Sequence, residues 1–275
     1  MSLLYLFAKR FVIGETREEA LQHAHTLNEQ GIGVIFNVLG EHVKHSSEIA
    51  EYIKEYQTLI KQLKGINAQV SLKLSQFGQG ISEDLCIANV TEVLNVAKKH
   101  NVFVWFDMED SSTLTSTLEV AKRLSKKYAI GVVLQCYLRN SHHIARSITT
   151  PVRLVKGAYK ESPRMVFTDK RKTNERYAQM MEYFIAKNHP CVIATHDEKL
   201  IALGEKLIKK YRRSNVDFAF LLGVKPQLQK KLVGKGYRVY VYAPYGKAWF
   251  AYYWRRMRER KENFIFALKS IFSWH

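Results

Sequence analysis

The feature that most limits how this chain can fold is a regular alternation of short apolar runs with longer segments of helical periodicity. The runs are rich in β-branched and aromatic residues and cover 32–38, 70–75, 102–108, 130–137, 151–156, 191–196, 216–222 and 238–242. Between them, apolar residues recur every three or four positions in 48–63, 83–100, 112–127, 173–187 and 199–211. This alternation favours parallel strands joined by crossover helices, and eight such units predict an α/β fold, a (β/α)8 TIM-like barrel. An open doubly wound sheet stays open as an alternative, because a count of strands does not establish closure.

The length of the chain agrees with one such barrel. The chain has 275 residues, and a (β/α)8 barrel needs roughly 250. Hydrophobic residues make up 47% of the sequence and there are only 5 prolines, so a core can form and composition gives no sign of disorder. No low-complexity tract or linker divides the sequence, and we therefore expect residues 1–275 to form a single catalytic domain.

The basic charge of the chain limits its partners only weakly. There are 43 basic and 25 acidic residues, a formal net charge of +18. The basic residues are spread along the expected helices, which is typical of solvated faces, while peripheral contact with an anionic membrane stays open as an alternative. The apolar stripe within residues 264–274 favours packing on its own domain, with the same alternative. No recognised nucleic-acid-binding motif accompanies the charge, so we expect no nucleic acid partner.

Cysteines and histidines give no sign of a metal or redox centre. The 3 cysteines are far apart and form no CxxC pair, which indicates a reducing compartment. The neighbouring histidines lack a complete ligand set, so we expect no metal. The segment MSLLYLFAKRF is unlike a signal peptide, and no run approaches the roughly 18 apolar residues of a spanning helix. We expect a cytoplasmic protein, with attachment to the inner face of the cell membrane left open.

Polar side chains gather where the expected strands end. The active site of such a barrel lies at the C-terminal ends of its strands, and a charged group in an apolar strand must be paired or face a polar site. The residues concerned are Lys73, Asp107, Glu109, Gln135, Arg153, Lys156, Thr195, His196 and Tyr242. Any one of them could belong to an ordinary buried ion pair, but polar ends on six of the eight strands favour a functional site.

The segment RLVKGAY suggests how a ligand could approach the backbone. Arg153 and Lys156 are followed by Gly157 and Ala158, whose small size admits a flat or phosphate-bearing ligand. The chain has neither a P-loop pattern nor G-x-G-x-x-G, so an ordinary Rossmann nucleotide site has no support. The two cations could instead face a phosphate or the electron-rich end of a cofactor.

A second ligand-holding segment is RRMRER, near the C-terminus. Arg255 and Arg256 precede Glu259 by four and three residues on an expected helix, so the carboxylate can pair with them. Each guanidinium group offers a planar, bidentate fork, and two of them held by a carboxylate can clamp a substrate carboxylate. By itself, an arginine pair in a basic helix is more often an exposed surface feature.

The residues alone leave other activities open. Lys73 and Lys156 both end strands, where burial or a neighbouring cation can make a lysine nucleophilic, so a Schiff-base lyase of the same fold is an alternative enzyme. A non-enzymatic, nucleic-acid-binding role is the alternative from a different class, and it depends on the charge alone.

Taken in order along the chain, these strings resemble the proline dehydrogenase family. They are RFVIGE, SLKLSQFG, FDMED, LQCYL, RLVKGAY, ATHD, LLGVKP, YAPYG and RRMRER, from about Arg10 to the C-terminus. Single strings are weak signals, but RLVKGAY and the spacing from YAPYG to the arginine pair are strong ones, and all occur in the same order.

The resemblance implies a distorted (β/α)8 barrel with the last helix over the C-terminal ends of the strands. It implies non-covalent FAD and oxidation of L-proline to 1-pyrroline-5-carboxylate, by hydride transfer from proline C5 to flavin N5. A quinone is the expected electron acceptor. Because nothing suggests a fused aldehyde dehydrogenase domain, the next step of proline catabolism would need a separate pyrroline-5-carboxylate dehydrogenase.

The resemblance also implies roles for individual residues. Asp107 would orient Lys73 and neighbouring groups and Arg153 would stabilise the reduced flavin, both as catalytic residues. The substrate-binding residues would be Lys73, Leu221, Tyr242, Arg255 and Arg256. The cofactor-binding residues would be Met108, Gln135, Lys156, Gly157, Ala158, Thr195, His196 and Glu259.

Two positions depart from the family pattern. Ala219 stands where the family usually has a glutamine, so one flavin contact would be missing or replaced. Lys160 stands where a tryptophan or aliphatic residue is common, and a cation beside the flavin would alter cofactor affinity or redox potential.

Overall fold

Eight parallel strands close into a barrel in the order of the sequence. The computed structural model describes residues 12–41, 43 and 45–246, and each strand pairs with its neighbours up to the closing pair of β1 and β8. The strands are β1 Ile32–Val38, β2 Ala68–Leu72, β3 Val104–Phe106, β4 Ile130–Gln135, β5 Val152–Val155, β6 Cys191–Ala194, β7 Val216–Leu221 and β8 Val239–Tyr245. Closure confirms the barrel and excludes the open sheet.

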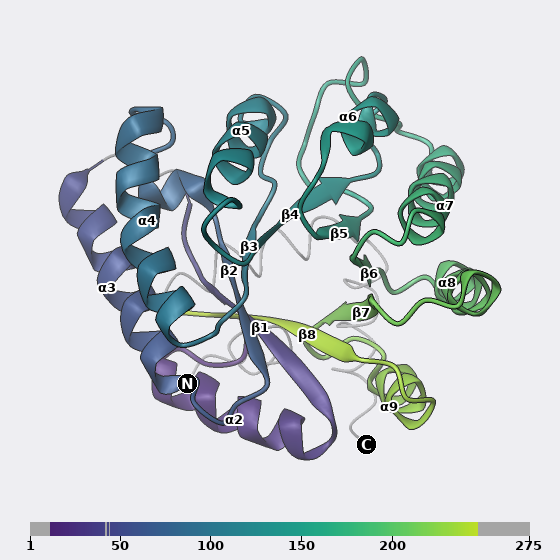
Figure 1. The fold of residues 1–275 in the computed structure, drawn as a ribbon, viewed down its shortest axis with the longest axis horizontal. Coiled ribbons are helices and arrows are strands. Elements are labelled where there is room, and N and C mark those ends of the chain that lie inside the picture. Colours follow the sequence, from purple (N-terminus) through teal and green to yellow (C-terminus); the bar gives the residue numbers. More distant parts are fainter. Residues whose placement is uncertain (1–11, 42, 44, 247–275) are drawn as a thin grey trace, which may run out of the picture.

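Helices surround the strands, as Figure 1 shows. They are α2 Arg17–Glu29, α3 Ser46–Gln62, α4 Glu83–Lys99, α5 Leu114–Leu124, α6 Ser141–Ser147, α7 Lys170–Ala186, α8 Glu198–Tyr211 and α9 Pro226–Gly234, with the short 3₁₀ helix η1 at Leu74–Phe77. The five helical segments expected from periodicity correspond to α3, α4, α5, α7 and α8. The C-terminal helix expected over the strand ends lies outside the described residues.

Side chains just before several helices determine where those helices begin. The hydroxyl of Ser82 accepts a hydrogen bond from the N–H of Leu85 at the start of α4. Asp197 accepts from the first N–H groups of α8, and Asp169 from the N–H of Arg171 at the start of α7. These side chains satisfy donors that lack a partner within the helix, which is why Ser and Asp favour N-cap positions.

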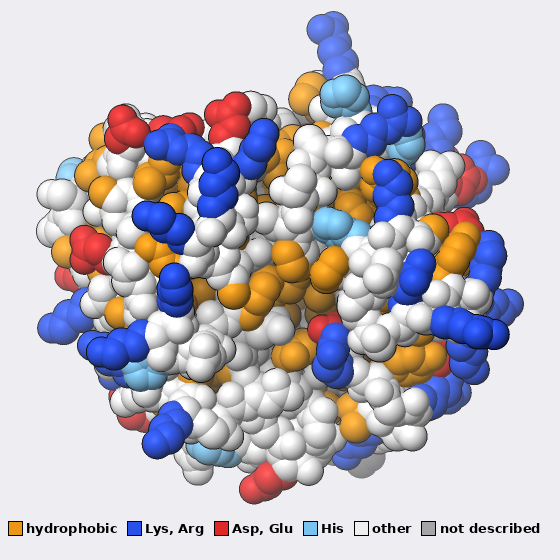
Figure 2. Space-filling view, viewed as in Figure 1, with side chains coloured by type: hydrophobic (Ala, Val, Ile, Leu, Met, Phe, Trp, Pro, Cys, Tyr) orange, Lys and Arg blue, Asp and Glu red, His pale blue; other side chains and the backbone are white. Residues whose placement is uncertain are grey.

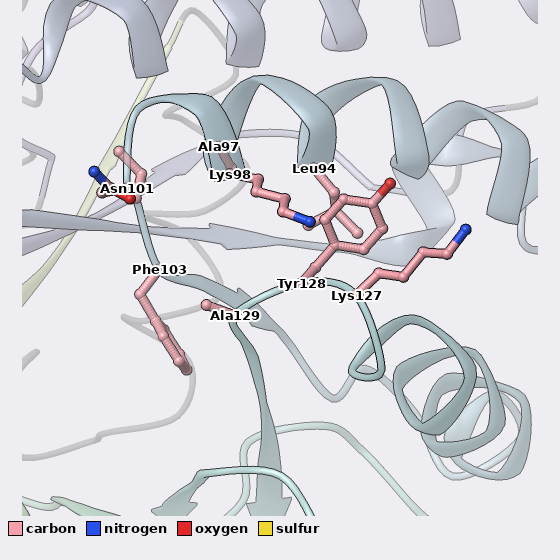
Figure 3. A pocket seen from close by; sticks show the side chains of 9 residues that line it. Leu94, Ala97, Lys98, Asn101, Phe103, Lys127, Tyr128 and Ala129 are labelled. Atoms are coloured by element: carbon pink, nitrogen blue, oxygen red, sulfur yellow. The ribbon is translucent and has the colours of Figure 1, made fainter.

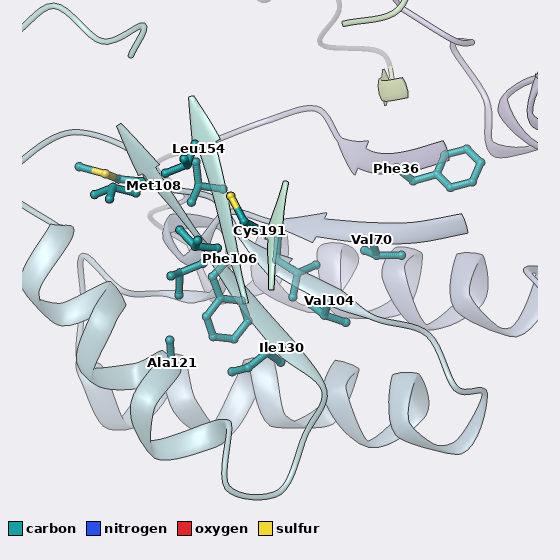
Figure 4. Close-up of a cluster of buried hydrophobic side chains, with 14 of the residues drawn as sticks. Phe36, Val70, Val104, Phe106, Met108, Ala121, Ile130, Leu154 and Cys191 are labelled. Carbon is teal, nitrogen blue, oxygen red and sulfur yellow. The ribbon is translucent and has the colours of Figure 1, made fainter. Parts of the chain in front are cut away.

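The main core lies between the strands and the helices. Outward-facing side chains of the strands, such as Phe106 and Ile130, pack with side chains of the helices, such as Ala121 of α5 (Figure 4). Strand residues two positions apart share a face, so this outer layer leaves every second strand residue directed into the barrel. In a parallel sheet both faces are buried, so the outward-facing side chains form a continuous apolar layer around the barrel.

A smaller apolar cluster fills the barrel interior. It consists of Ile35, Trp105, Val192, Ala219 and Tyr240. Glycines make room for its large rings, because a Cβ added at Gly131 would lie 2.6 Å from the Trp105 ring and one added at Gly33 would lie 2.5 Å from the Tyr240 ring. The barrel interior below the C-terminal ends of the strands is therefore filled with side chains. These side chains exclude water from beneath the polar groups at that end.

Several strand boundaries differ from the sequence expectation, and two of the differences have a clear local cause. The run 70–75 ends as a strand at Leu72, because η1 starts two residues later and Lys73 is its N-cap residue. The last strand continues past Tyr242 to Tyr245 although it contains Pro244. Pro244 is tolerated because the pairing of β7 with β8 ends opposite Tyr242, so the missing N–H interrupts no ladder there.

The surface carries its positive charge in a dispersed form. On the face shown in Figure 2, lysine and arginine side chains surround a hollowed centre with hydrophobic side chains, and they are most frequent over α7, α8 and α9. Many of them lie beside carboxylates, as in Lys210 with Glu182 and Lys235 with Glu205. In the part of the chain that the structure describes, no helix is both long and apolar enough to span a membrane.

Candidate active site

The centre of the candidate site is Asp107, the residue that follows β3. Its Oδ1 accepts a hydrogen bond from the Ser71 hydroxyl at 2.7 Å and another from Nη2 of Arg153, with which it forms an ion pair. Its Oδ2 accepts a hydrogen bond from the Tyr242 hydroxyl at 2.8 Å. Donors from β2, β5 and β8 therefore converge on one carboxylate at the C-terminal end of the barrel.

Arg153 points from β5 into the barrel and is almost fully buried, with 3% of its surface exposed. Besides Asp107, its Nη2 donates to the Ser71 hydroxyl at 2.9 Å. The guanidinium carbon lies 5.2 Å from the ring centre of Trp105 and 5.3 Å from that of Tyr242. Its Nη1 is buried without a hydrogen-bond partner among the described residues. A buried charged donor without an acceptor is costly, so Nη1 is a candidate contact for an acceptor outside the described residues.

Lys73 lies close to the loop that follows β1. Its Nζ is 3.5 Å from the carbonyl oxygen of Gly40 and 3.7 Å from Oε2 of Glu41, and the residue is only 6% exposed. The buried side chain of Gln76 links the same elements: its Oε1 accepts from the N–H of Lys73 and from the Tyr56 hydroxyl, and its Nε2 donates to Gly40 O at 2.9 Å. Lys73 is thus held by the segments that follow β1 and β2. The contacts of Asp107 described above are to other residues, namely Ser71, Arg153 and Tyr242.

Gln135, at the end of β4, links three neighbouring segments. Its Nε2 donates to the carbonyl oxygen of Glu109 at 2.7 Å and is 3.4 Å from that of Met108, and its Oε1 accepts from the N–H of Ala158 at 3.2 Å. The Met108 side chain belongs to the outer core (Figure 4). Met108 therefore contacts Gln135 through the backbone carbonyl oxygen of Met108 and not through the Met108 side chain.

Gly157 allows a close approach of the chain to an aromatic ring. Its φ is +121°, and an added Cβ would lie 2.3 Å from Cδ1 of Tyr137. Residues with a side chain rarely adopt this φ, so glycine is required for both conformation and space. The Tyr137 hydroxyl also donates to the carbonyl oxygen of Tyr159 at 3.1 Å, so the ring holds the segment after β5 in place.

Lys156 belongs to a second polar group, above β5 and β6. Its Nζ lies 2.9 Å from Oδ2 of Asp197, which also accepts from Nδ2 of Asn174 at 3.2 Å. Thr195 accepts a hydrogen bond from the N–H of Asp197 at 3.2 Å. Burial acts to raise the pKa of Asp197, but the Lys156 ammonium and two backbone N–H groups at the start of α8 outweigh it and lower this pKa below its ordinary value.

His196 and Leu221 form a separate contact. Nε2 of His196 accepts a hydrogen bond from the N–H of Leu221 at 2.9 Å, and the imidazole packs against the ring of Phe220. Because an accepting Nε2 carries no proton, this contact selects the tautomer with the proton on Nδ1.

The structure brings most of the expected site residues to one end of the barrel and adds others. Arg255, Arg256 and Glu259 lie outside the described residues. Ser71, Trp105 and Glu41 were not singled out from the sequence, although Ser71 and Trp105 precede Lys73 and Asp107 by two positions and so share their face of the strand. Of the two departures, Ala219 lies buried in the interior cluster and Lys160 is exposed.

A hollow at the opposite end of the barrel is separate from this site. It has a volume of about 410 Å³ and is lined by residues that precede β3 and β4, among them Phe103 and Tyr128. Figure 3 shows Lys98 reaching toward the Tyr128 ring, with its Nζ 5.8 Å from the ring centre. Active sites of such barrels lie at the other end. Among the described residues, no group of three or more His, Cys, Asp or Glu could hold a metal ion.

Comparison with known sequences places the chain in a family. The sequence profile described as proline dehydrogenase matches residues 20–267. Proline dehydrogenase 1 of Bacillus subtilis (strain 168) is 36% identical over 97% of this chain and 91% of the relative. Proline dehydrogenase of Deinococcus radiodurans is 32% identical over 98% of this chain and 91% of the relative.

A solved structure shows the same barrel. The crystal structure of proline utilization A (PutA) from Bdellovibrio bacteriovorus inactivated by N-propargylglycine has a TM-score of 0.86 and 26% identity. The match covers 94% of this chain but spans only 33% of that longer chain. Because the family profile and the curated relatives cover nearly the whole sequence, the chain belongs to the proline dehydrogenase family and is an oxidoreductase of proline catabolism.

Proposed function

We propose that this chain oxidises L-proline to 1-pyrroline-5-carboxylate with non-covalently bound FAD. The observation that carries the proposal is the buried Arg153, tied to Asp107 and Ser71 at the strand ends while its Nη1 has no partner in the described part of the chain. When bound, FAD would supply the redox chemistry, because its N5 can accept a hydride from C5 of proline. The protein contributes orientation and electrostatics.

The residues at the strand ends fit such a cofactor. A cation with an unused buried donor suits the electron-rich part of a flavin, because charge that develops there is stabilised without reorganisation of the protein. Gln135 has its side-chain amide at the same end of the barrel, beside the backbone N–H of Ala158. Lys156, Thr195 and His196 offer polar groups around β5 and β6 for the remainder of FAD.

The substrate needs groups that recognise an anion on a small apolar ring. Lys73 supplies a nearly buried ammonium, and we propose that Arg255 and Arg256 complete the carboxylate clamp, with Glu259 as a cofactor-binding residue. Leu221 and Tyr242 offer apolar surface for the ring. Asp107 holds Tyr242 and Arg153 in their orientations through the hydrogen bonds described above.

The acceptor and the location of the protein are further parts of the proposal. A quinone would reoxidise the flavin, in a cytoplasmic protein of one domain, with peripheral contact to an anionic membrane as the alternative location. A separate dehydrogenase would consume the product. The excess of lysine and arginine supports membrane contact. Failure to bind anionic liposomes at low salt would contradict the membrane contact. The proposed reaction would not be affected by that result.

The reaction is tested by identifying its product. Incubation with L-proline and a soluble electron acceptor should give 1-pyrroline-5-carboxylate, detected by its coloured adduct with o-aminobenzaldehyde. Arg153→Met should lower the rate at least about 100-fold, as loss of a preorganised charged donor does. Arg146→Met, at an exposed arginine of α6, should leave the rate within about twofold. Absence of this product from the wild-type protein would refute the proposed reaction.

A further inference from the structure

Trp105 lies beneath the catalytic group in the barrel interior. It is on β3 two residues before Asp107, so both side chains point inward. Only 2% of its surface is exposed. The guanidinium carbon of Arg153 lies 5.2 Å from its ring centre, within the range of a cation–π interaction.

Three neighbours hold the indole in one orientation. Its Nε1 donates to Oε1 of Gln69 at 2.6 Å. The Phe103 ring packs against it with the ring centres 4.9 Å apart. Gly131 leaves the space that the indole occupies, because a Cβ there would lie 2.6 Å from the ring. A side chain held by a hydrogen bond and by packing on both its edges can impose its position on a neighbour.

The contacts of Arg153 leave its guanidinium few other orientations. One nitrogen, Nη2, makes both the bond to Asp107 and the bond to Ser71. Bonds from a single nitrogen leave the plane of the group free to turn, whereas the rings of Trp105 and Tyr242 restrict that plane. The plane decides where the unpartnered Nη1 points.

We propose that Trp105 is a positioning residue, which holds the guanidinium of Arg153 so that Nη1 faces the cofactor. The inference depends on the proposed function for the identity of that cofactor. Ala219, a departure from the family pattern, lies in the same interior cluster as Trp105.

Substitution of Trp105 by Phe and by Leu separates the effect of an aromatic ring from the effects of the rest of the side chain. Phe keeps a ring and Leu does not. Both variants lose the hydrogen bond to Gln69, so a difference between them reports on the ring that faces Arg153. Phe218→Leu is the matched control, because Phe218 is a fully buried aromatic residue of the outer core whose ring packs against Tyr237.

The first readout is the urea midpoint of the apoprotein and needs neither flavin nor activity. Trp105→Leu should have a lower midpoint than Trp105→Phe, and this difference should vanish in the Arg153→Met background. If that background does not fold, Arg153→Met with Asp107→Asn replaces it, since no unpaired buried charge remains. A difference of equal size in both backgrounds would overturn the inference, because Trp105 would then only fill space.

The second readout is the reduction potential of bound FAD. Trp105→Leu should lower it by about 30 mV, a tenfold change in the two-electron reduction equilibrium, while Trp105→Phe and Phe218→Leu stay near the wild-type value. Equal potentials in all variants would overturn the positioning role. A protein that binds no FAD would refute the proposed function, and the urea comparison would still decide whether Trp105 restrains Arg153.

Discussion

The Tyr242 hydroxyl donates a hydrogen bond to Oδ2 of Asp107 at 2.8 Å across 135 positions of sequence. The other carboxylate oxygen, Oδ1, is taken by Ser71 and Arg153. Three strands are therefore joined through one side chain that can only accept. Because Asp107 also balances the buried charge of Arg153, the stability of the barrel and the geometry of the site depend on the same residue.

Replacement of Asp107 by Asn should be costly. The amide places a donor where Asp107 accepts and leaves Arg153 buried without its counter-charge, which typically costs about 3 kcal/mol or more. The unfolding free energy from urea titration should fall by about that amount, and proline oxidation should fall with it. Tyr242→Phe removes a single neutral donor and should cost about 1 kcal/mol. Equal losses would mean that the charge of Asp107 contributes little.

Gly157→Ala should impair both folding and cofactor binding. The added Cβ would meet the Tyr137 ring at 2.3 Å in a backbone at φ +121°, and strain of this kind costs on the order of 1–3 kcal/mol. Thermal unfolding and FAD titration of the apoprotein measure the two effects. Gly65→Ala is the control, since its φ is also positive at +81° but nothing lies within 4 Å of an added Cβ. If both substitutions cost the same, crowding by Tyr137 has no part.

The 3 cysteines should be inert in the folded protein. All are buried and unpaired, and burial raises the pKa of Cys86 to about 12 and those of Cys136 and Cys191 further. Only the thiolate reacts readily. Iodoacetamide at pH 8 should therefore add nothing to the native mass and three groups after denaturation. Rapid labelling of one native thiol would contradict this account.

The pair of Lys156 and Asp197 should stabilise the protein at neutral pH and lose this effect in acid. The pKa of Asp197 in the folded protein is lowered from its ordinary value of 3.8, so folding favours the ionised carboxylate. The stabilisation is complete above that value and disappears as the pH falls through the lower folded pKa. Asp197→Asn keeps an N-cap oxygen for α8 while it removes the charge.

Urea titrations of the wild type and Asp197→Asn from pH 7 to 3 measure this dependence. The gap in unfolding free energy should stay constant down to about pH 5 and shrink below about pH 4. A gap that widened on acidification would mean that Asp197 is protonated more readily when folded, contrary to the charge of Lys156.

The barrel could be predicted because its determinants are local. Strand and helix periodicities lie within short segments, and polar residues such as Asp107 and Lys156 interrupt them at recognisable places. The two strand ends that were discussed above also have local causes. The 3₁₀ helix η1 begins directly after Lys73, and β8 continues through Pro244 because β7 no longer pairs with it there.

The pairing of side chains across the barrel could not be predicted in the same way. That Asp107 meets Arg153 and Tyr242 depends on the stagger between strands and on closure, neither of which appears in the periodicity of one segment. Trp105 and Ser71 could have been found by counting two residues back from Asp107 and Lys73. Their contacts with Arg153 could not, since these need the register of β2, β3 and β5 together. The expected cofactor contacts of Met108, Thr195 and His196 stay predictions.

The most direct test of the central claim is the visible absorbance of the purified, FAD-supplied protein before and after anaerobic addition of L-proline. The account predicts a flavin band near about 450 nm that bleaches when proline is added and not when buffer is added. A bound flavin that proline leaves oxidised would contradict the proposed substrate. A colourless protein that takes up no FAD would contradict the flavoenzyme itself and return attention to a Schiff base at Lys73 or Lys156.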